Sequence, residues 1–231
     1  MSLYARYFKR LLDFALSLFA LLVLSPLLLL LTVLGALIMK GNPFFTQLRP
    51  GKDEKIFRLI KFRTMTCEKD ADGNFLPDEK RLVPYGKFLR STSLDELPEL
   101  LNILKGDMAI VGPRPQLVRD MVFMTAEQRR RHTVRQGLTG LAQISGRNAL
   151  SWENKLVYDL KYIQDISFVN DLAIIFRTFF KTIQRDGITE VGQATAMDFG
   201  DYLLSQKRIT EEQYRQGQEE ARRLLMEAER S

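Results

Sequence analysis

An uncharged run of 26 residues near the N-terminus, from Phe14 to Met39, most constrains how this chain can fold. As one straight helix, the run would be roughly 39 Å long, which exceeds the roughly 30 Å thickness of a bilayer core. Pro26, preceded by Ser25, interrupts it near the centre. Because proline removes one helical hydrogen bond and clashes with the carbonyl four residues earlier, we expect a break there. The Ser25 hydroxyl can bond a carbonyl that the proline frees.

Basic residues flank both ends of this apolar run. Arg6, Lys9 and Arg10 precede it, and seven lysines and arginines follow between residues 40 and 63. Basic flanks mark the cytoplasmic side, so a single crossing satisfies only one end. Two halves of about 12 residues reach roughly 18 Å each, and a re-entrant helix-break-helix hairpin, broken at Pro26, satisfies both ends. A proline-kinked spanning helix is the alternative, whereas a secretory signal peptide is disfavoured by the length of the run.

The rest of the 231-residue chain is long enough for one soluble domain and a tail. We expect a membrane hairpin over residues 1–40, a soluble cytoplasmic domain over 41–190 and a charged, partly helical tail over 191–231. The net charge of +6 and the isoelectric point near 9.4 suit nucleic acid, an anionic membrane or a phosphate-bearing substrate. The apolar run favours the last two, and no nucleic-acid recognition module is recognisable.

The chain has one cysteine, Cys67, and one histidine, His132. A lone cysteine excludes an internal disulfide and a cysteine-based metal cluster, and it agrees with a reducing cytoplasm. Three arginines precede His132, so we expect this histidine on a solvated basic face. Chemistry that needs a histidine base and a serine or cysteine nucleophile is therefore disfavoured.

The patterns of apolar residues and turn formers predict a mainly helical α+β fold with short strands and amphipathic helices that lie at the membrane interface. Residues 68–84 are expected to form a surface loop. Helix 171–185 carries phenylalanines among basic residues, which fits either core packing or the membrane interface. The tail is expected to be a solvated appendage, with a capping box at Thr210 opening a helix. Strands are expected at residues 55–65, where Lys61 and Arg63 would share a face, and at 107–111, and helices at 125–135, 152–165 and 171–185.

Adjacent carboxylates, Asp95 and Glu96, stand just before an apolar helical run. Since proline is tolerated only in the first turn of a helix, Pro98 predicts a helix that begins at about Asp95, with Asp95 as its N-cap. The ordinary interpretation is helix capping, because Ser93 and Glu96 fit a capping box. The alternative is a site at which a carboxylate acts on phosphate.

Nearby basic residues favour the phosphate site. Arg90 and Arg114 lie close in sequence to the carboxylates, and prolines at 113 and 115 restrict the backbone on both sides of Arg114. Further on, three glycines between residues 136 and 148 indicate either backbone that approaches a ligand or a tight path between elements.

Motifs through most of the chain resemble the monotopic phosphoglycosyl transferases of bacteria, the small catalytic-core type, and are similar to those that start glycan assembly with UDP-bacillosamine-like sugars. The resemblance covers about residues 6 to 187 and leaves out the tail. Leu141 replaces a common tryptophan, which leaves the packing or membrane contact of its loop open, and Glu99 replaces a common glutamine. Neither departure is expected to touch the chemistry. The motifs are Lys9-Arg10 with Asp13, Ser25-Pro26, Gln47-x-Arg49-x-Gly51, Lys61-Phe62-Arg63-Thr64-Met65, Arg90 with Ser93-Leu94-Asp95-Glu96-Leu97-Pro98, Gly106-Asp107-Met108, Gly112-Pro113-Arg114-Pro115, and Gly137-x-Thr139-Gly140-x-Ala142-Gln143 leading into Gly146-Arg147-Asn148.

The resemblance implies that the chain transfers a phosphosugar from a UDP-sugar to polyprenyl (undecaprenyl) phosphate and releases UMP, as the first membrane step of glycoconjugate biosynthesis. Asp95 is then the nucleophile that forms an aspartyl-phosphosugar and the expected ligand of Mg²⁺. Glu96 would position the acceptor phosphate or transfer a proton. The candidate phosphate-binding residues are Lys61, Arg63, Arg90, Arg114, Arg147 and Asn148.

The resemblance also implies a monotopic protein of the bacterial inner (cytoplasmic) membrane whose catalytic domain faces the cytoplasm. Expected partners are the UDP-sugar, the lipid phosphate and membrane lipids; a homodimer is left open and nucleic acid is excluded. A membrane-anchored, non-enzymatic phosphate- or lipid-binding scaffold is the alternative, as is a spanning transferase that would release UDP. The sequence specifies neither the sugar nor the role of the tail.

Overall fold

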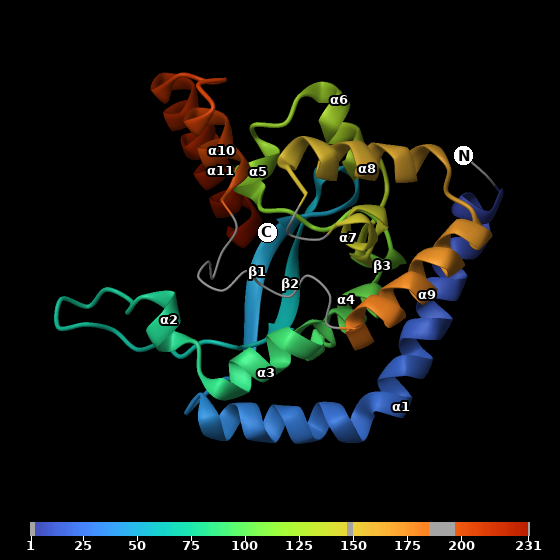
Figure 1. The fold of residues 1–231 in the computed structure, drawn as a ribbon, viewed down its shortest axis with the longest axis horizontal. Coiled ribbons are helices and arrows are strands. Elements are labelled where there is room, and N and C mark those ends of the chain that lie inside the picture. The colour runs from blue at the N-terminus through green and yellow to red at the C-terminus, as the bar shows by residue number, and fades with distance from the viewer. Residues whose placement is uncertain (1–2, 147–149, 185–196, 231) are drawn as a thin grey trace.

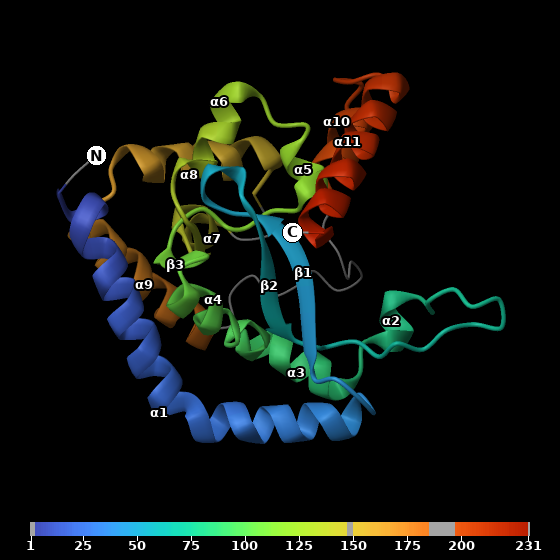
Figure 2. The ribbon, with the colours of Figure 1, turned by 180° about the vertical axis from the view of Figure 1, so that it is seen from behind.

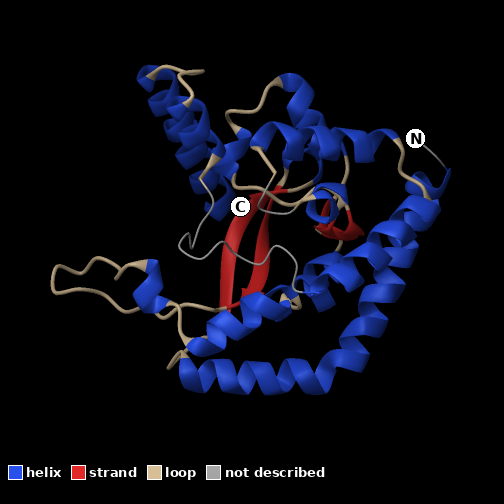
Figure 3. Cartoon of the chain, viewed as in Figure 1, coloured by secondary structure: helices blue, strands red, loops and turns tan. Residues whose placement is uncertain are grey.

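The computed structural model describes residues 3–146, 150–184 and 197–230 of the chain. Helices surround two small two-stranded sheets, which confirms the predicted mainly helical α+β fold (Figure 3). A long N-terminal helix runs along one edge of the molecule (Figure 1). This helix and the preceding turn, Tyr4–Ile38, are long and apolar enough to cross a membrane by length and composition.

The N-terminal helix is bent. The π-helical turn η1 (Tyr4–Phe8) leads into α1 (Lys9–Ile38), whose ribbon turns sharply about halfway along (Figures 1 and 2). Pro26 lies inside α1, and the Ser25 hydroxyl donates to the Leu22 carbonyl at 2.8 Å. The predicted break therefore takes the form of a bend between two helical arms. How the arms lie relative to a bilayer remains a prediction.

An antiparallel hairpin forms the larger sheet. Strand β1 (Phe44–Pro50) pairs with β2 (Ile56–Phe62) in a register that places Phe45 opposite Lys61 and Arg49 opposite Phe57. The 3-10 turn η2 (Lys52–Glu54) connects the strands. Strand β1 was not predicted. One face of the hairpin contributes Phe57 and Leu59 to a cluster with Leu100, Ile103 and Met108.

The segment between this hairpin and the carboxylates contains a projecting excursion and one helix. The excursion carries the short helix α2 (Asp78–Arg81) and extends from the body of the molecule, as expected for a surface loop (Figure 1). Helix α3 (Pro84–Thr92) begins with Pro84 in its first turn. It passes so close to Thr64 that a Cβ on Gly86 would lie 1.8 Å from the Thr64 carbonyl oxygen. Glycine therefore permits the contact that fixes α3 beside the end of β2.

The helix after the carboxylates begins later than predicted. Asp95 lies in the 3-10 turn η3 (Leu94–Glu96), and α4 spans Glu99–Lys105 with Pro98 as its N-cap residue. Ser93 has a left-handed backbone (φ 56°) that ends α3, and it makes no side-chain capping bond. The prediction that Asp95 caps the helix was wrong, because a separate turn places it ahead of α4.

The smaller sheet brings two glycine-containing segments together. Strand β3 (Met108–Val111) pairs in parallel with β4 (Gln136–Thr139). A Cβ on Gly137 would lie 2.1 Å from the Gly112 backbone nitrogen, so this glycine allows a tight path between elements. Between the strands are α5 (Val118–Met121), α6 (Ala126–Arg129) and the 3-10 turn η4 (Arg130–Thr133), so the helix expected over 125–135 is shorter than predicted.

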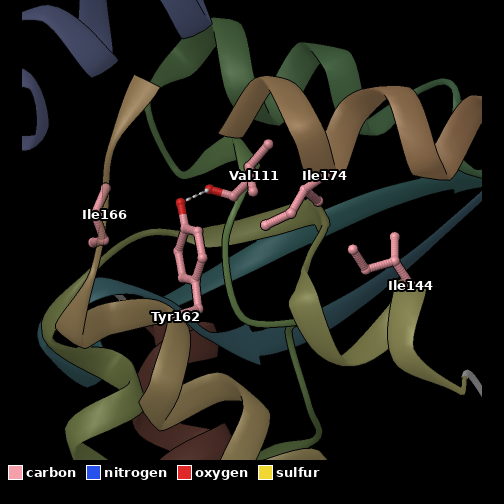
Figure 4. Close-up of a cluster of buried hydrophobic side chains, with 5 residues drawn as sticks. All are labelled: Val111, Ile144, Tyr162, Ile166 and Ile174. Atoms are coloured by element: carbon pink, nitrogen blue, oxygen red, sulfur yellow. Dashed lines mark hydrogen bonds between the residues drawn. The ribbon is translucent and has the colours of Figure 1, made fainter. Parts of the chain in front are cut away.

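Two longer helices cover β3. After α7 (Leu141–Ser145), helices α8 (Trp152–Gln164) and α9 (Phe168–Gln184) follow close to the predicted ranges. Their apolar residues form a cluster with β3, in which the Tyr162 hydroxyl donates to the Val111 carbonyl (Figure 4). The outer face of α9 exposes Phe176, Phe179 and Phe180, so core packing does not account for these side chains.

The C-terminal segment is packed against the domain. Helices α10 (Phe199–Ser205) and α11 (Glu211–Arg230) lie beside α5 (Figure 1). Phe199 and Leu203 are buried with Trp152, and Ala221 is buried against Val118. The expectation of a solvated appendage was wrong, because small and aromatic residues in these helices have partners far away in sequence. The Thr210 capping box is confirmed by reciprocal bonds with Gln213.

Candidate active site

Asp95 carries the first of the two adjacent carboxylates. Among the described residues, its side chain has no hydrogen bond or ion pair, although its neighbours on both sides are engaged in the fold. Burial raises the pKa of Asp95 to about 6, assisted by the negative charge of Glu96 and opposed by Lys61, Arg114 and Arg90. The carboxylate is therefore mainly ionised near neutral pH and free to act on a ligand.

Glu96 joins two cations that come from different parts of the chain. Its Oε1 accepts from Lys61 Nζ on β2 and from Arg114 Nη2, each at 2.7 Å. Burial alone would raise the pKa of Glu96, but the charges of Arg114 and Lys61 outweigh burial and hold the pKa well below its usual range. Glu96 therefore stays ionised, which favours positioning of the cations over proton donation. Its side chain does not serve as a helix cap.

Glu99 completes this network at its buried side. Lys61 Nζ lies 3.1 Å from Glu99 Oε1, and Glu99 is 3% exposed. Burial raises the pKa of Glu99 to about 7 against the opposing charge of Lys61. Glu99 thus contacts a candidate phosphate-binding residue, while the expectation that it does not touch the chemistry stays a prediction. The three-residue spacing from Glu96 is the signal for it, because residues three apart lie on the same side of a helical segment.

The other two candidate arginines before the carboxylates occupy different places. Arg90 Nε donates to Thr64 Oγ1 at 3.0 Å, and its charge contributes to lowering the pKa of Asp95. Arg63 lies beyond the end of β2, where Nη2 approaches the Phe44 carbonyl at 3.5 Å. The strand therefore does not carry Lys61 and Arg63 together, and no hydrogen bond or ion pair joins Arg63 to the carboxylates among the described residues.

A buried arginine supports the loop that carries Arg114. Arg131 is fully buried, donates through Nη2 to the Arg114 carbonyl and forms an ion pair with Asp159 of α8 at 2.8 Å. His132 is 1% exposed, so the prediction of a solvated basic face was wrong. Burial and the charge of Arg131 together lower the pKa of His132 to about 3, so the imidazole is neutral. The run of basic residues in the sequence did not reveal that Arg131 is buried, because its partner Asp159 lies 28 residues later.

The sequence profile of the family described as bacterial sugar transferase matches residues 4–185. The chain belongs to the bacterial sugar transferase family. This match confirms the predicted resemblance and the prediction of a transferase. Helices α10 and α11 lie outside the matched range.

Named relatives agree with this family. The uncharacterized sugar transferase EpsL of Bacillus subtilis (strain 168) is 47% identical over 192 residues, which cover 83% of this chain and 95% of the relative. The UDP-glucose:undecaprenyl-phosphate glucose-1-phosphate transferase of Klebsiella pneumoniae is 42% identical over 144 residues, 60% of this chain and 31% of the relative. The undecaprenyl-phosphate galactose phosphotransferase of Salmonella typhimurium (strain LT2) is 33% identical over 204 residues, 79% of this chain and 42% of the relative. This sugar transferase thus spans less than half of each of the last two proteins.

Asp95 is the residue of this sugar transferase at which we expected Mg²⁺ to bind. The described residues contain no group of three histidine, cysteine or acidic residues that could hold a metal ion. Mg²⁺ is commonly bound through one or two carboxylates together with substrate phosphates, and the unpaired Asp95 carboxylate fits that mode. Arg147 and Asn148 lie outside the described residues, so their predicted role remains a prediction.

Proposed function

We propose that this sugar transferase moves a phosphosugar from a UDP-sugar to polyprenyl (undecaprenyl) phosphate and releases UMP. The observation that carries the proposal is the Asp95 carboxylate, which has no hydrogen bond or ion pair among the described residues and stands next to Glu96, which holds Lys61 and Arg114. The names of two relatives supply the substrate classes. One is named a UDP-glucose:undecaprenyl-phosphate glucose-1-phosphate transferase, and the other an undecaprenyl-phosphate galactose phosphotransferase.

The reaction would proceed in two displacements. An Asp95 carboxylate oxygen attacks the β-phosphorus, and the bond from that phosphorus to the bridging oxygen breaks, so UMP leaves with the bonding electrons. An oxygen of the lipid phosphate then attacks the same phosphorus. The bond to Asp95 breaks, which restores the free carboxylate and yields the lipid diphosphosugar.

Negative charge is the main obstacle to the first step, since a carboxylate must approach a diphosphate. Lys61 and Arg114 place positive charge on the side of Glu96, and Arg90 adds charge near Asp95. Mg²⁺, when bound to Asp95 and the substrate, supplies further positive charge. Glu96 fixes both cations before substrate arrives, which lowers the reorganisation that the step requires.

The lipid acceptor explains the apolar surfaces. The bent α1 and the exposed phenylalanines of α9 indicate membrane association, and we infer that α1 enters one leaflet from the cytoplasmic side of the inner membrane. A soluble site held at that interface meets the phosphate of a lipid whose tail stays in the bilayer.

The test is a burst experiment without the lipid acceptor. Given Mg²⁺ and a UDP-sugar from a panel, the enzyme should release UMP in an amount no larger than the enzyme present. Asp95→Asn should keep the fold and abolish the burst. Asp72→Asn, the same change on the exposed excursion, should leave it intact.

Three results would contradict the proposal. A folded Asp95→Asn protein with normal turnover would show that another group attacks phosphorus. Release of UDP would indicate direct sugar transfer instead. Binding of lipid phosphate without any nucleotide product across the panel would favour the scaffold.

A further inference from the structure

Two arginines hold the backbone of the Arg114 loop at neighbouring positions. Arg131 donates to the Arg114 carbonyl, and Arg49 Nη1 donates to the Pro115 carbonyl at 3.2 Å. They differ in one respect. Arg131 has the Asp159 carboxylate as its counter-ion, whereas Arg49 forms no ion pair with any of the described residues.

Arg49 has unused donor capacity. A guanidinium has five N–H groups. Within the described part of the chain, two of those of Arg49 are engaged: Nη1 with the Pro115 carbonyl, and Nη2 with Gln47 Oε1 at 2.7 Å. Its Nε is buried without a partner among the described residues. The nearby Asp120 carboxylate already accepts from the backbone nitrogens of Leu117 and Phe199. Three N–H groups of this partly buried guanidinium therefore have no acceptor among the described residues.

The charges around Arg49 include the cation Arg114, which has the largest effect, and the carboxylates Asp120 and Glu99, neither of which forms an ion pair with it. Burial and the positive charge of Arg114 together lower the pKa of Arg49 to about 10, against the opposing charges of Asp120 and Glu99. Lys155 adds a third positive charge near Arg114, and burial followed by the Arg114 charge lowers its pKa as well. A partly buried cation that stands near another cation and has no ion-pair partner among the described residues favours an anionic ligand.

The hairpin places Arg49 in line with the carboxylate site. Arg49 and Lys61 lie on the same face, because Arg49 pairs with Phe57 and Lys61 with Phe45, at alternate positions of the two strands. Four residues of strand, roughly 13 Å, separate the two pairs. The Arg114 loop is linked to both ends of this interval. Arg114 and Lys61 share the Glu96 carboxylate, and the Pro115 carbonyl accepts a hydrogen bond from Arg49.

We propose that Arg49 is a further substrate-binding residue, which binds the phosphate of the nucleotide that leaves as UMP. This inference rests on the proposed function. A nucleotide phosphate is favoured over the lipid phosphate because β1 starts beside the end of α1 and runs away from it, which places Arg49 at the far end of the hairpin (Figure 1). The substrate would then extend from Asp95 along Arg114 to Arg49.

The test measures binding of UMP to detergent-solubilised enzyme by calorimetry, without turnover. Arg49→Gln should weaken UMP binding by about 10- to 100-fold, the range of a lost charge-assisted hydrogen bond. Uridine, which lacks phosphate, should bind both proteins equally. Arg58→Gln is the matched control, since Arg58 is exposed on the opposite face of the same hairpin and should bind UMP normally.

A second variant and a kinetic readout separate binding from folding and from the lipid source. Arg49→Lys keeps the charge but loses the planar fork, so it should fall between wild type and Arg49→Gln. The KM for polyprenyl phosphate should stay within twofold in both variants. A rise in the KM for polyprenyl phosphate without any loss of UMP binding would overturn the inference. The same holds if folded Arg49→Gln protein binds UMP as tightly as Arg58→Gln does. Either result would leave the proposed function standing. Wild-type enzyme that does not bind UMP would overturn the proposed function as well.

Discussion

The Ser25 hydroxyl donates to the Leu22 carbonyl at 2.8 Å, one residue before Pro26. Leu22 precedes Pro26 by four residues, so its carbonyl is the acceptor that proline deprives of a backbone donor. Serine therefore satisfies the group that the break exposes, which matters where no water is available. This pair would stabilise the bend if α1 enters a lipid leaflet as proposed.

The first prediction concerns the topology of α1. In a Cys67→Ser background, Leu3→Cys and Phe45→Cys, both at exposed positions, should react with a membrane-impermeant maleimide only from the cytoplasmic side. Reaction of the two new cysteines from opposite sides would show that α1 spans the bilayer.

A change at the bend tests the same point from the other direction. Pro26→Leu restores the backbone donor, so α1 should straighten and the label at residue 3 should become accessible from the opposite side. Ser25→Ala is the control. It keeps the proline, so labelling should not change, although the loss of one hydrogen bond should cost about 1 kcal/mol of stability.

The second prediction concerns the coupling of Glu96 to its cations. Glu96→Gln leaves Lys61 and Arg114 without their shared carboxylate, so turnover should fall by roughly 10²-fold or more. Because Glu96 and Arg114 are in contact, Glu96→Gln and Arg114→Gln should be strongly non-additive in a double-mutant cycle of kcat. Glu127→Gln, which removes an exposed ion pair, should change kcat little. Additive effects would mean that the two side chains act separately.

Local signals in the sequence predicted the parts of the fold that depend on neighbours along the chain. The capping box at Thr210 forms, and α8 and α9 lie close to the predicted ranges. The Asp95-Glu96 pair was also identified as the candidate site. Each of these rests on contacts within a few residues, which hydrophobic spacing and capping residues report directly.

The missed features depend on contacts between distant segments. Strand β1 is fixed by its pairing with β2, and Arg131 is buried because Asp159, 28 residues later, neutralises it. The turn that separates Asp95 from α4 requires the left-handed Ser93, which no local preference favours. Tertiary partners decided these outcomes, and no periodicity in the chain encodes them.

The third prediction concerns His132 and acid stability. Its pKa is lowered to about 3 by burial and by Arg131, whereas the unfolded chain takes up that proton near pH 6.5. As pH falls below 6.5, the unfolded state gains a proton that the folded state does not, so the free energy of unfolding should fall by about 1.4 kcal/mol per pH unit from this group.

Comparison of two proteins isolates this effect. His132→Gln should lose stability less steeply than wild type between pH 6.5 and 5, measured by denaturant unfolding at several pH values. The two proteins must be compared because Glu99, whose pKa is raised to about 7, affects the free energy of unfolding in the opposite direction. As pH falls, the folded state takes up the Glu99 proton before the unfolded state does. Parallel slopes for the two proteins would contradict a buried neutral imidazole.

The last prediction concerns the C-terminal helices. Phe199 is 2% exposed, its ring centroid lies 5.0 Å from that of Trp152, and its backbone nitrogen donates to Asp120 at 2.9 Å. Phe199→Ala should therefore lower the free energy of unfolding by about 3 to 5 kcal/mol, through lost burial and the cavity left behind. Met226→Ala removes an apolar side chain that is 58% exposed on α11 and should cost much less. Equal, small effects in thermal and denaturant unfolding would show that α10 is a loose appendage, whereas a large effect at Phe199 alone would show that the segment beyond the family match is part of the folded core.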